Sequence, residues 1–338
     1  MATGNREGQY DRIHASMKCP VCGASTRRHF THGSYWIRAC DDCSHKVAEF
    51  AAAADHVATT YDDDYFEGGA AGYQDYLSEA EILIEHGRRY GQLMTNYSKA
   101  GKVFDVGAAA GFLLKGYMQA GWYGEGIEPN ARMAEYARTR LGVPVATGNL
   151  ESFHADTVFD LVSMIQILAH FVDPRAALKV AASITRPGGF WLVETWNRES
   201  LTARLFGKRW HEYSPPSVLH WFSPKGVSKL ASEFGFRELG RGRPNKWISG
   251  RHAKSLIRYR LENSHLNWPI TSLIRLLPDR VNLPYPPKAG PPSPPLPSSP
   301  GCPAKVIICP LGVTHRRIWL KLSEMKTLPF GSAATPRG

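Results

Sequence analysis

Residues 103–114 constrain the fold of this chain most, because they join a strand pattern to a helix pattern through a turn of very small residues. The first four include two valines and a phenylalanine, which favours a strand buried on both faces. From Gly107 to Gly111 no side chain exceeds a methyl group, so the backbone can approach a ligand closely. Open α/β sheets bind nucleotides at such strand–turn–helix units, although the same pattern also serves as a plain packing turn.

From residue 102 onward, short apolar runs alternate with helix-like runs, which predicts a parallel sheet with helices packed on it. The expected strands are residues 102–106, 123–127, 143–147, 159–164 and 190–194. The expected helices are residues 112–120, 131–141, 174–184 and 224–234, two of which start with Asp173-Pro174 and Ser223-Pro224. The run Pro187-Gly188-Gly189 predicts a turn before the last of these strands.

An acidic residue, Glu128, ends the second predicted strand, 23 residues after Asp105. In nucleotide-binding folds a carboxylate about 20 residues beyond the first turn accepts hydrogen bonds from the ribose hydroxyls. Alternatively, Glu128 is simply favoured by the dipole of the helix that follows. Together with the turn and the alternating pattern, it predicts a nucleotide ligand. The spacing of the glycines does not fit the dinucleotide fingerprint G-x-G-x-x-G.

Four of the six cysteines form two C-x2-C pairs, with 17 residues between the pairs: Cys19, Cys22, Cys40 and Cys43. This spacing favours zinc over disulfides in a chain whose first 18 residues do not resemble a secretion signal. Four thiolates leave no open coordination position, so we expect a structural ion. The alternatives are a redox pair or unrelated buried cysteines. Three nearby histidines are expected at the surface: His29, His32 and His45.

The net charge of +11 is unevenly distributed. Residues 288–338 contain seven basic residues and one acid, which gives +6 and leaves +5 for the other 287 residues. Charge alone is therefore poor evidence for a nucleic-acid partner, which stays open as the less favoured case. No apolar run reaches the roughly 18 residues of a membrane helix. We therefore expect a cytoplasmic protein with no membrane partner.

Several motifs occur in order and together resemble the class I S-adenosylmethionine-dependent methyltransferases. The turn reads D-x-G-x-A-x-G, similar to the first motif of that family, D/E-x-G-x-G-x-G. Residues 126–130, 159–174 and 186–193 resemble its ribose-binding strand end and its fourth and fifth strands. Residues 220–236 resemble the late helix of small-molecule enzymes related to ubiquinone O-methylation.

This resemblance covers about residues 101–239 and implies a Rossmann-like α/β fold with a mostly parallel, seven-stranded sheet. It also implies S-adenosyl-L-methionine as the cofactor. The cofactor-binding residues that it implies are Asp105, Gly107, Ala109, Gly111, Glu128, Asn149 and Gln166.

The chain departs from the family pattern at four places. Ala109 replaces a glycine, which we expect to be tolerated with a negative φ. Asn149 stands where the family commonly has an acid, and could still meet the adenine amino group. Ala169 precedes His170 where the family usually has Glu, so an acid or metal role is not expected there. Proline-rich sequence replaces the final strand expected near residue 283, and family-like sequence is expected to end near residue 287.

The cysteine pairs followed by residues 61–68 (Y-x3-Y-F-E-G) also resemble zinc-containing methyltransferases of natural-product and sugar metabolism. In that reading residues 61–68 close over the methionine end of the cofactor. We therefore expect five parts. They are a zinc ribbon at 15–50, a helical linker or lid at 51–100, a methyltransferase domain at 101–240, a basic helical extension at 241–285 and a disordered Pro-rich tail at 286–338.

Methyl transfer from a sulfonium is an in-line displacement, so catalysis comes mainly from alignment in a dry pocket. A base is needed only if the acceptor must lose a proton. His170 and His220 are the candidate bases, although His170 equally fits a role in fixing its loop by hydrogen bonds. We expect O-methylation of a small molecule. The alternatives are an RNA methyltransferase that uses the ribbon to recognise its substrate, and a cofactor-binding scaffold without activity.

Overall fold

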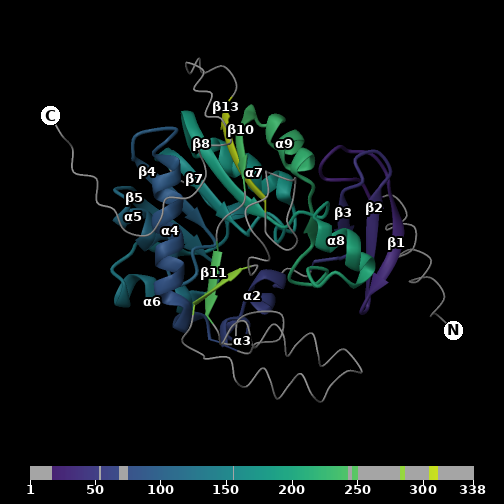
Figure 1. Ribbon diagram of the computed structural model, residues 1–338, viewed down its shortest axis with the longest axis horizontal. Coiled ribbons are helices and arrows are strands. Elements are labelled where there is room, and N and C mark those ends of the chain that lie inside the picture. Colours follow the sequence, from purple (N-terminus) through teal and green to yellow (C-terminus); the bar gives the residue numbers. More distant parts are fainter. Residues whose placement is uncertain are drawn as a thin grey trace.

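A large twisted sheet flanked by helices dominates the computed structural model, and a small sheet lies at one end of it (Figure 1). The structure describes residues 17–52, 55–67, 75–154 and 156–242, and the backbone of strands at 246–249, 282–285 and 304–310. Within these ranges no helix combines the length and the apolar character needed to cross a bilayer.

The large sheet has the strand order β10-β13-β8-β7-β4-β5-β6. Its parallel strands are β4 (Lys102–Val106), β5 (Tyr123–Glu128), β6 (Val145–Thr147), β7 (Phe159–Ile165) and β8 (Thr185–Thr195). β13 (Ala304–Pro310) lies antiparallel between β8 and β10 (Phe236–Gly242). The expected Rossmann-like, mostly parallel sheet of seven strands is confirmed.

Strand β13 contradicts the expectation that the chain has little stable structure after residue 286. Its sequence holds three consecutive β-branched apolar residues, Val306, Ile307 and Ile308, which suit a strand hydrogen-bonded on both edges. The missing final strand therefore lies beyond the prolines and not near residue 283. Two short strands, β11 (Lys246–Ser249) and β12 (Asn282–Tyr285), pair in the predicted helical extension. The predicted helices there, and the rest of the tail, fall outside the described residues.

The turn predicted at residues 187–189 is also wrong, because these residues lie inside β8. The pairing of β7 with β8 is irregular here: Phe159 faces Thr185, and Leu161 faces Phe190. Gly188, at φ 78°, allows the extra residues to form a bulge without ending the strand.

Helices cover both faces of the large sheet, and alternate strand residues point to each side. Val103, Leu161 and Phe190 pack in one buried cluster with residues of α4 (Ala80–Met94), α5 (Phe112–Gln119) and α6 (Ala131–Arg140). Phe104 and Val162 pack in the other cluster with residues of α7 (Pro174–Ser183) and α9 (Pro224–Ser232). The predicted helices are thus present. Asn130, Asp173 and Ser223 cap three of them with side-chain hydrogen bonds.

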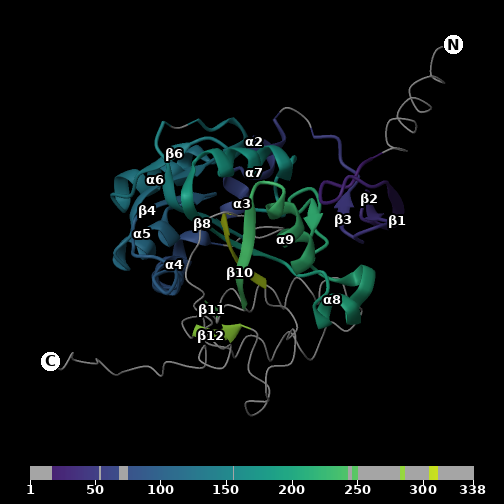
Figure 2. The same ribbon diagram turned by 90° about the horizontal axis from the view of Figure 1, so that it is seen from above.

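The small sheet has the order β1-β2-β3-β9 and joins the N-terminal segment to the large domain. It consists of β1 (Thr26–His32), β2 (Tyr35–Cys40), β3 (Lys46–Ala48) and β9 (His220–Trp221). Its edge strand β9 comes from a distant part of the sequence. Figure 2 places the first three strands beside α9, and Gly226 of that helix lies close to Val21.

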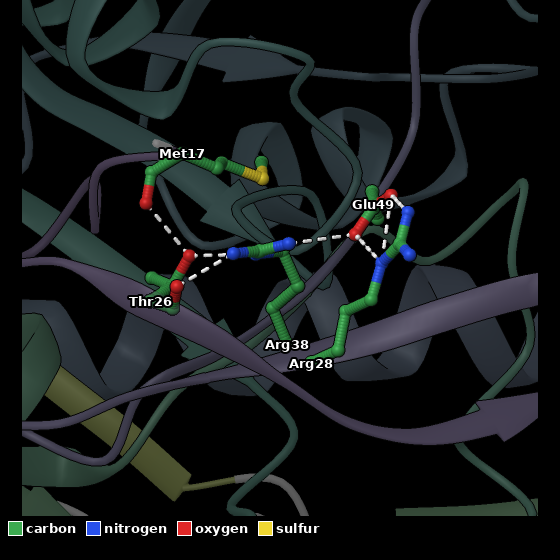
Figure 3. A network of polar contacts seen from close by, with 5 residues as sticks. All are labelled: Met17, Thr26, Arg28, Arg38 and Glu49. Carbon is green, nitrogen blue, oxygen red and sulfur yellow. Dashed lines mark hydrogen bonds and ion pairs between the residues drawn. The ribbon is translucent and has the colours of Figure 1, made fainter. Parts of the chain in front are cut away.

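A buried arginine anchors the small sheet (Figure 3). Arg38 donates from Nη1 to Glu49 at 2.7 Å and from Nε to the Thr26 hydroxyl at 2.8 Å. The Thr26 hydroxyl in turn donates to the Met17 carbonyl, and Arg28 donates to the same Glu49. The bonds from Arg28 hold the pKa of Glu49 below its usual range, even though burial opposes them. A buried cation needs such complete pairing.

The remaining described helices connect these layers. They are α2 (His56–Thr60), α3 (Asp63–Glu67), α8 (Leu201–Phe206), and the 3-10 helices η1 (Tyr76–Glu79), η2 (Leu150–Ser152) and η3 (Gly207–Arg209).

Candidate active site and cysteine cluster

The small-residue turn after β4 has a left-handed backbone at three alternate positions. The φ angles are 66° at Gly107, 47° at Ala109 and 79° at Gly111. The expectation of a negative φ at Ala109 is therefore wrong. A left-handed alanine costs about 1–2 kcal/mol, because its Cβ crowds the backbone. A Cβ added at Gly107 would lie 2.4 Å from Cδ1 of Ile167, so this position has little spare room.

Glu128 holds the turn from the carboxyl end of β5. Its Oε2 accepts a hydrogen bond from the Ala109 N–H at 2.8 Å, and its Oε1 accepts one from the Asn130 N–H at 2.9 Å. Burial raises the pKa of Glu128 to about 7, and the two backbone donors act against this rise. Each carboxylate oxygen has a second lone pair, so the side chain can still accept ligand hydroxyl protons.

Asp105 is buried beneath the turn. Burial raises its pKa to about 7; the hydrogen bond from Ser163 lowers it, and the charge of Glu128 adds to the rise. Its Oδ2 is inaccessible and has no hydrogen-bond partner among the described residues. An unpaired buried carboxylate oxygen costs about 1–3 kcal/mol. Asp105 therefore holds an unsatisfied acceptor in the core beneath the turn.

Gln166 and Asn149 follow the carboxyl ends of two other strands. The backbone N–H of Gln166, at φ 59°, donates to the Glu194 carbonyl at 2.7 Å, and its side-chain Nε2 lies 3.3 Å from Glu194 Oε1. The Oδ1 of Asn149 accepts two hydrogen bonds, from the backbone N–H and the hydroxyl of Ser152. Asn149 therefore has its amide N–H groups to offer a ligand and not its oxygen. That does not suit the expected contact with an adenine amino group, which is itself a donor.

Residues 55–67 lie against the turn and form a candidate lid. Asn130 Nδ2 donates to the Tyr61 carbonyl at 3.1 Å and to Asp63 Oδ1 at 3.0 Å. Arg132 forms ion pairs with Asp63 and Glu67. Phe66 is buried in one cluster with Ala109, Ala110 and Phe112. Asn130 and Arg132, at the start of the helix that follows Glu128, thus anchor residues 55–67.

His170 follows β7 and contacts the lid through Tyr61. Its Nδ1 lies 2.7 Å from the Ser217 carbonyl and 3.0 Å from the Tyr61 hydroxyl, which itself donates to Ser217 at 2.8 Å. Two donors on one carbonyl satisfy all three groups, so we assign the Nδ1–H tautomer. Burial lowers the pKa of His170 to about 4, although hydrogen bonds to the backbone carbonyls of Ser217 and Gln166 act to raise it. The imidazole is therefore neutral near pH 7.

His220, the other predicted base, lies in β9, the edge strand of the small sheet. Its Nδ1 lies 3.3 Å from Nε2 of His45, and burial lowers its pKa to about 4. His45 is 2% exposed, so the expectation that it lies at the surface is wrong. The Ala169 carbonyl accepts from the backbone N–H groups of Leu219 and His220, so the two predicted bases lie on adjacent backbone segments. Their rings nevertheless contact different neighbours.

Two residues of this region were missed by sequence reasoning. Tyr61 was recognised only as part of a closing segment, and the role of His45 was not anticipated. The hydrophobic periodicity of the sequence does not predict either contact, because each contact joins residues more than 100 positions apart.

The four predicted cysteines converge on one point. Their Sγ atoms all lie within 4.8 Å of one another, with Cys19 and Cys43 at 3.5 Å and Cys22 and Cys40 at 3.3 Å. All four are free thiols. Tetrahedral zinc–thiolate bonds of about 2.3 Å place sulfur atoms roughly 3.8 Å apart, so this set fits a zinc ion.

Part of the chain is similar in sequence to known proteins. Residues 79–239 match the protein family described as "Methyltransferase domain". The ubiquinone biosynthesis O-methyltransferase of Rhodopseudomonas palustris is 28% identical over 133 residues, which cover 37% of this chain and 49% of that protein. The protein of the same name from Stutzerimonas stutzeri is 30% identical over 142 residues, 39% of this chain and 61% of that one. The chain thus spans about half to three fifths of these relatives.

Among solved structures, a SAM-dependent methyltransferase from Thermotoga maritima is similar to this chain at 26% identity. The similarity covers 48% of this chain and 75% of that chain, with a TM-score of 0.39.

A parallel α/β sheet with a small-residue turn after its first strand and an acid after its second defines a nucleotide-type binding domain. The family match agrees with this class: residues 79–239 match the methyltransferase-domain family and are similar in part to proteins named as O-methyltransferases. The resemblance seen in the sequence motifs is therefore confirmed.

Proposed function

We propose that the chain transfers a methyl group from S-adenosylmethionine to an oxygen of a small molecule. The observation that carries the proposal is the bond between Glu128 and the left-handed turn at Ala109, beside the buried, unpaired Oδ2 of Asp105. Asp105 and Glu128 lie towards the carboxyl ends of two neighbouring parallel strands, where they would accept hydrogen bonds from an ammonium group and from ribose hydroxyls. The relatives named as O-methyltransferases support oxygen as the accepting atom.

S-adenosylmethionine, when bound, supplies a methyl group on a sulfonium that is activated for in-line displacement. Glu128 would hold the ribose and Asp105 the methionine ammonium. Gly107 and Gly111 give the backbone clearance, and the remaining predicted contacts are Ala109, Asn149 and Gln166. The lid at residues 55–67 would exclude water, which favours transfer over side reactions.

His170 would take the proton of the acceptor. The Nδ1–H bond to Ser217 leaves Nε2 with the lone pair, and burial keeps the ring neutral at physiological pH. The same lowered pKa makes the free imidazole a weak base, so the proposed role rests on the tautomer and the position of the ring. The bound cofactor would supply the methyl group for displacement at carbon, and Nε2 of His170 would accept the proton that the acceptor oxygen loses. His220 is the weaker candidate, because its Nδ1 already faces His45.

We also propose that the four cysteines bind one structural zinc ion. The close spacing of the four Sγ atoms and their origin in two tight turns support this assignment. Four thiolates would fill the coordination shell, so the ion would stabilise the fold without touching substrate. A cytoplasmic location stays a prediction.

Incubating the purified chain with radiolabelled S-adenosylmethionine and separate pools of small metabolites and RNA tests the acceptor class. We expect label in the small-molecule fraction, in an acid-stable and base-stable ether. Label in RNA would support the nucleic-acid alternative. Cofactor binding without transfer to either pool would support an inactive scaffold.

A further inference from the structure

Two arginines of the methyltransferase domain reach the two cysteine turns. Arg175, in the first turn of α7, donates from Nε to the carbonyl of Pro20 at 2.6 Å. Pro20 stands between the first two cysteines of the cluster. Arg198, three residues beyond the end of β8, donates from Nη2 to the Ser44 hydroxyl at 2.6 Å and lies 3.5 Å from the Cys43 carbonyl. Each cysteine pair is therefore contacted by one cation from outside the small sheet.

The guanidinium of Arg198 is buried, but its partners among the described residues do not pair all of its donors or its charge. Its side chain is 11% exposed, and its Nε has no hydrogen-bond partner among the described residues. Its ion-pair partner there is Glu199, at 3.2 Å, and that carboxylate is 42% exposed. A buried guanidinium with an unpaired donor calls for nearby negative charge. A divalent ion with four thiolate ligands carries net negative charge and would lie beside Cys43.

The backbone segments that carry these arginines also carry the predicted bases. His170 precedes Arg175 by five residues in the loop that leads into α7. The Ala169 carbonyl joins this loop to Leu219 and His220, and His220 pairs with Val47 of the small sheet. Arg198 donates its backbone N–H to the Phe222 carbonyl. The cysteine turns and both histidine segments thus form one hydrogen-bonded unit.

Buried packing links the same parts. Cys19, Val21 and Cys40 belong to the same buried cluster as Phe171 and Phe222. Phe171 directly follows His170, and Phe222 is two residues after His220. The cysteine cluster is therefore part of the core of the methyltransferase domain, and a change in its geometry must displace side chains on the acceptor side.

We propose that Arg175 and Arg198 are positioning residues that complete the zinc site from the methyltransferase domain, and that the loaded site fixes the segments bearing His170 and His220. The inference rests on the proposed zinc ion. It assigns to the metal a role beyond folding of the small sheet. The ion fixes the segments of His170 and His220 in position relative to the turn at residues 105–111.

Zinc release from the full-length chain tests the first half of this proposal. Arg175→Met and Arg198→Met should each speed zinc loss to an excess of a chromophoric chelator by about 10-fold or more, because hydrogen-bond partners around metal ligands typically affect metal affinity by that factor. Arg27→Met is the matched control. Arg27 pairs with Asp41, which lies between two cysteines, but its side chain is 66% exposed and belongs to the small sheet. Its release rate should match the wild type.

Hydrogen exchange on the wild-type chain tests the second half without any variant. Removing zinc with the chelator should speed amide exchange in residues 169–175 and 217–222, while the turn at residues 105–111 keeps its protection. Cofactor affinity of each arginine variant, measured by calorimetry, verifies that the cofactor side remains folded.

The outcomes separate the two proposals. A wild-type chain that binds no zinc would overturn the zinc assignment itself. A zinc-loaded wild type whose arginine variants release the ion at the Arg27→Met rate would overturn the role of the arginines. Unchanged exchange at residues 169–175 and 217–222 after chelation would overturn the coupling to the histidine segments.

Discussion

The backbone N–H of Ala109 donates to the carboxylate of Glu128 across 2.8 Å, so a strained turn and a buried acid from the next strand hold each other in place. Only a left-handed residue at this position forms the observed turn, and alanine adopts that conformation at a cost. The bond to Glu128 offsets part of that cost.

Replacing Ala109 with glycine should therefore stabilise the chain by up to about 1 kcal/mol. The relieved strain of about 1–2 kcal/mol exceeds the extra chain entropy of an unfolded glycine, about 0.4–1 kcal/mol. Urea unfolding measures the change. The reciprocal control, Gly107→Ala, should destabilise by a similar amount or more, since it adds a Cβ at φ 66°. A destabilised Ala109→Gly chain would show that the methyl group contributes packing that outweighs the strain.

Cofactor affinity should rise with pH across neutrality. Burial raises the carboxyl pKa values of Asp105 and Glu128 from 3.8 and 4.5 to about 7, so below pH 7 both groups are mostly protonated in the free protein. A ligand with cationic ammonium and sulfonium groups favours the ionised forms, so binding strengthens as pH rises through about 7. Calorimetry at pH 6 and pH 8 should differ by up to about tenfold for each carboxyl.

Asp105→Asn removes one of the two titrating groups, and should lower affinity at pH 8 while flattening the pH dependence. An unaltered pH profile in this variant would show that Asp105 does not titrate on binding.

The imidazole of His170 should make stability depend on pH in the acid range. Its pKa falls from 6.5 to about 4 on folding, so the unfolded chain binds more protons between these values. The contribution of the neutral His170 ring to the free energy of unfolding is fully present above about pH 6.5 and is lost as pH falls towards 4. The stability gap between the wild type and His170→Gln should therefore narrow on acidification, measured by denaturant unfolding. His154→Gln, at an exposed position, is the control. A gap that stays constant from pH 7 to pH 5 would contradict the buried neutral state.

Much of the fold follows from local sequence patterns. The turn at residues 107–111, the acid at Glu128 and the alternating strands and helices were predictable, because small residues, β-branched runs and capping residues act over a few positions. The cysteine cluster was predictable from its spacing.

The rest depends on distant contacts. Strand β13 follows a long Pro-rich stretch, and only its two neighbours in the sheet, β8 and β10, reveal it as the seventh strand. The sequence around Gly188 is typical of a turn, and only the pairing of β8 with β7 shows that these residues form a bulge. Tyr61 acts through His170, 109 positions away, and His45 through His220, 175 positions away. Such pairs leave no periodic signal in a single sequence.

Zinc content gives a direct test of the cysteine cluster. The wild-type chain should contain one zinc ion per chain by elemental analysis, and Cys40→Ser should lose most of it, because a hydroxyl is a poor zinc ligand. Asp41→Asn changes an exposed residue between two of the cysteines and should keep its zinc. Full zinc occupancy in Cys40→Ser would contradict the assignment of the four cysteines as zinc ligands.

The central claim is that Glu128 and the turn at Ala109 bind S-adenosylmethionine, and calorimetric titration of the cofactor tests it most directly. Glu128→Ala should weaken binding by about 1–3 kcal/mol, the cost of leaving ribose hydroxyls unpaired. Glu125→Ala, on the same strand with its side chain 41% exposed, should bind as the wild type does. Equal affinity in Glu128→Ala and the wild type would contradict the ribose assignment, and a wild type that binds no cofactor would contradict the whole account.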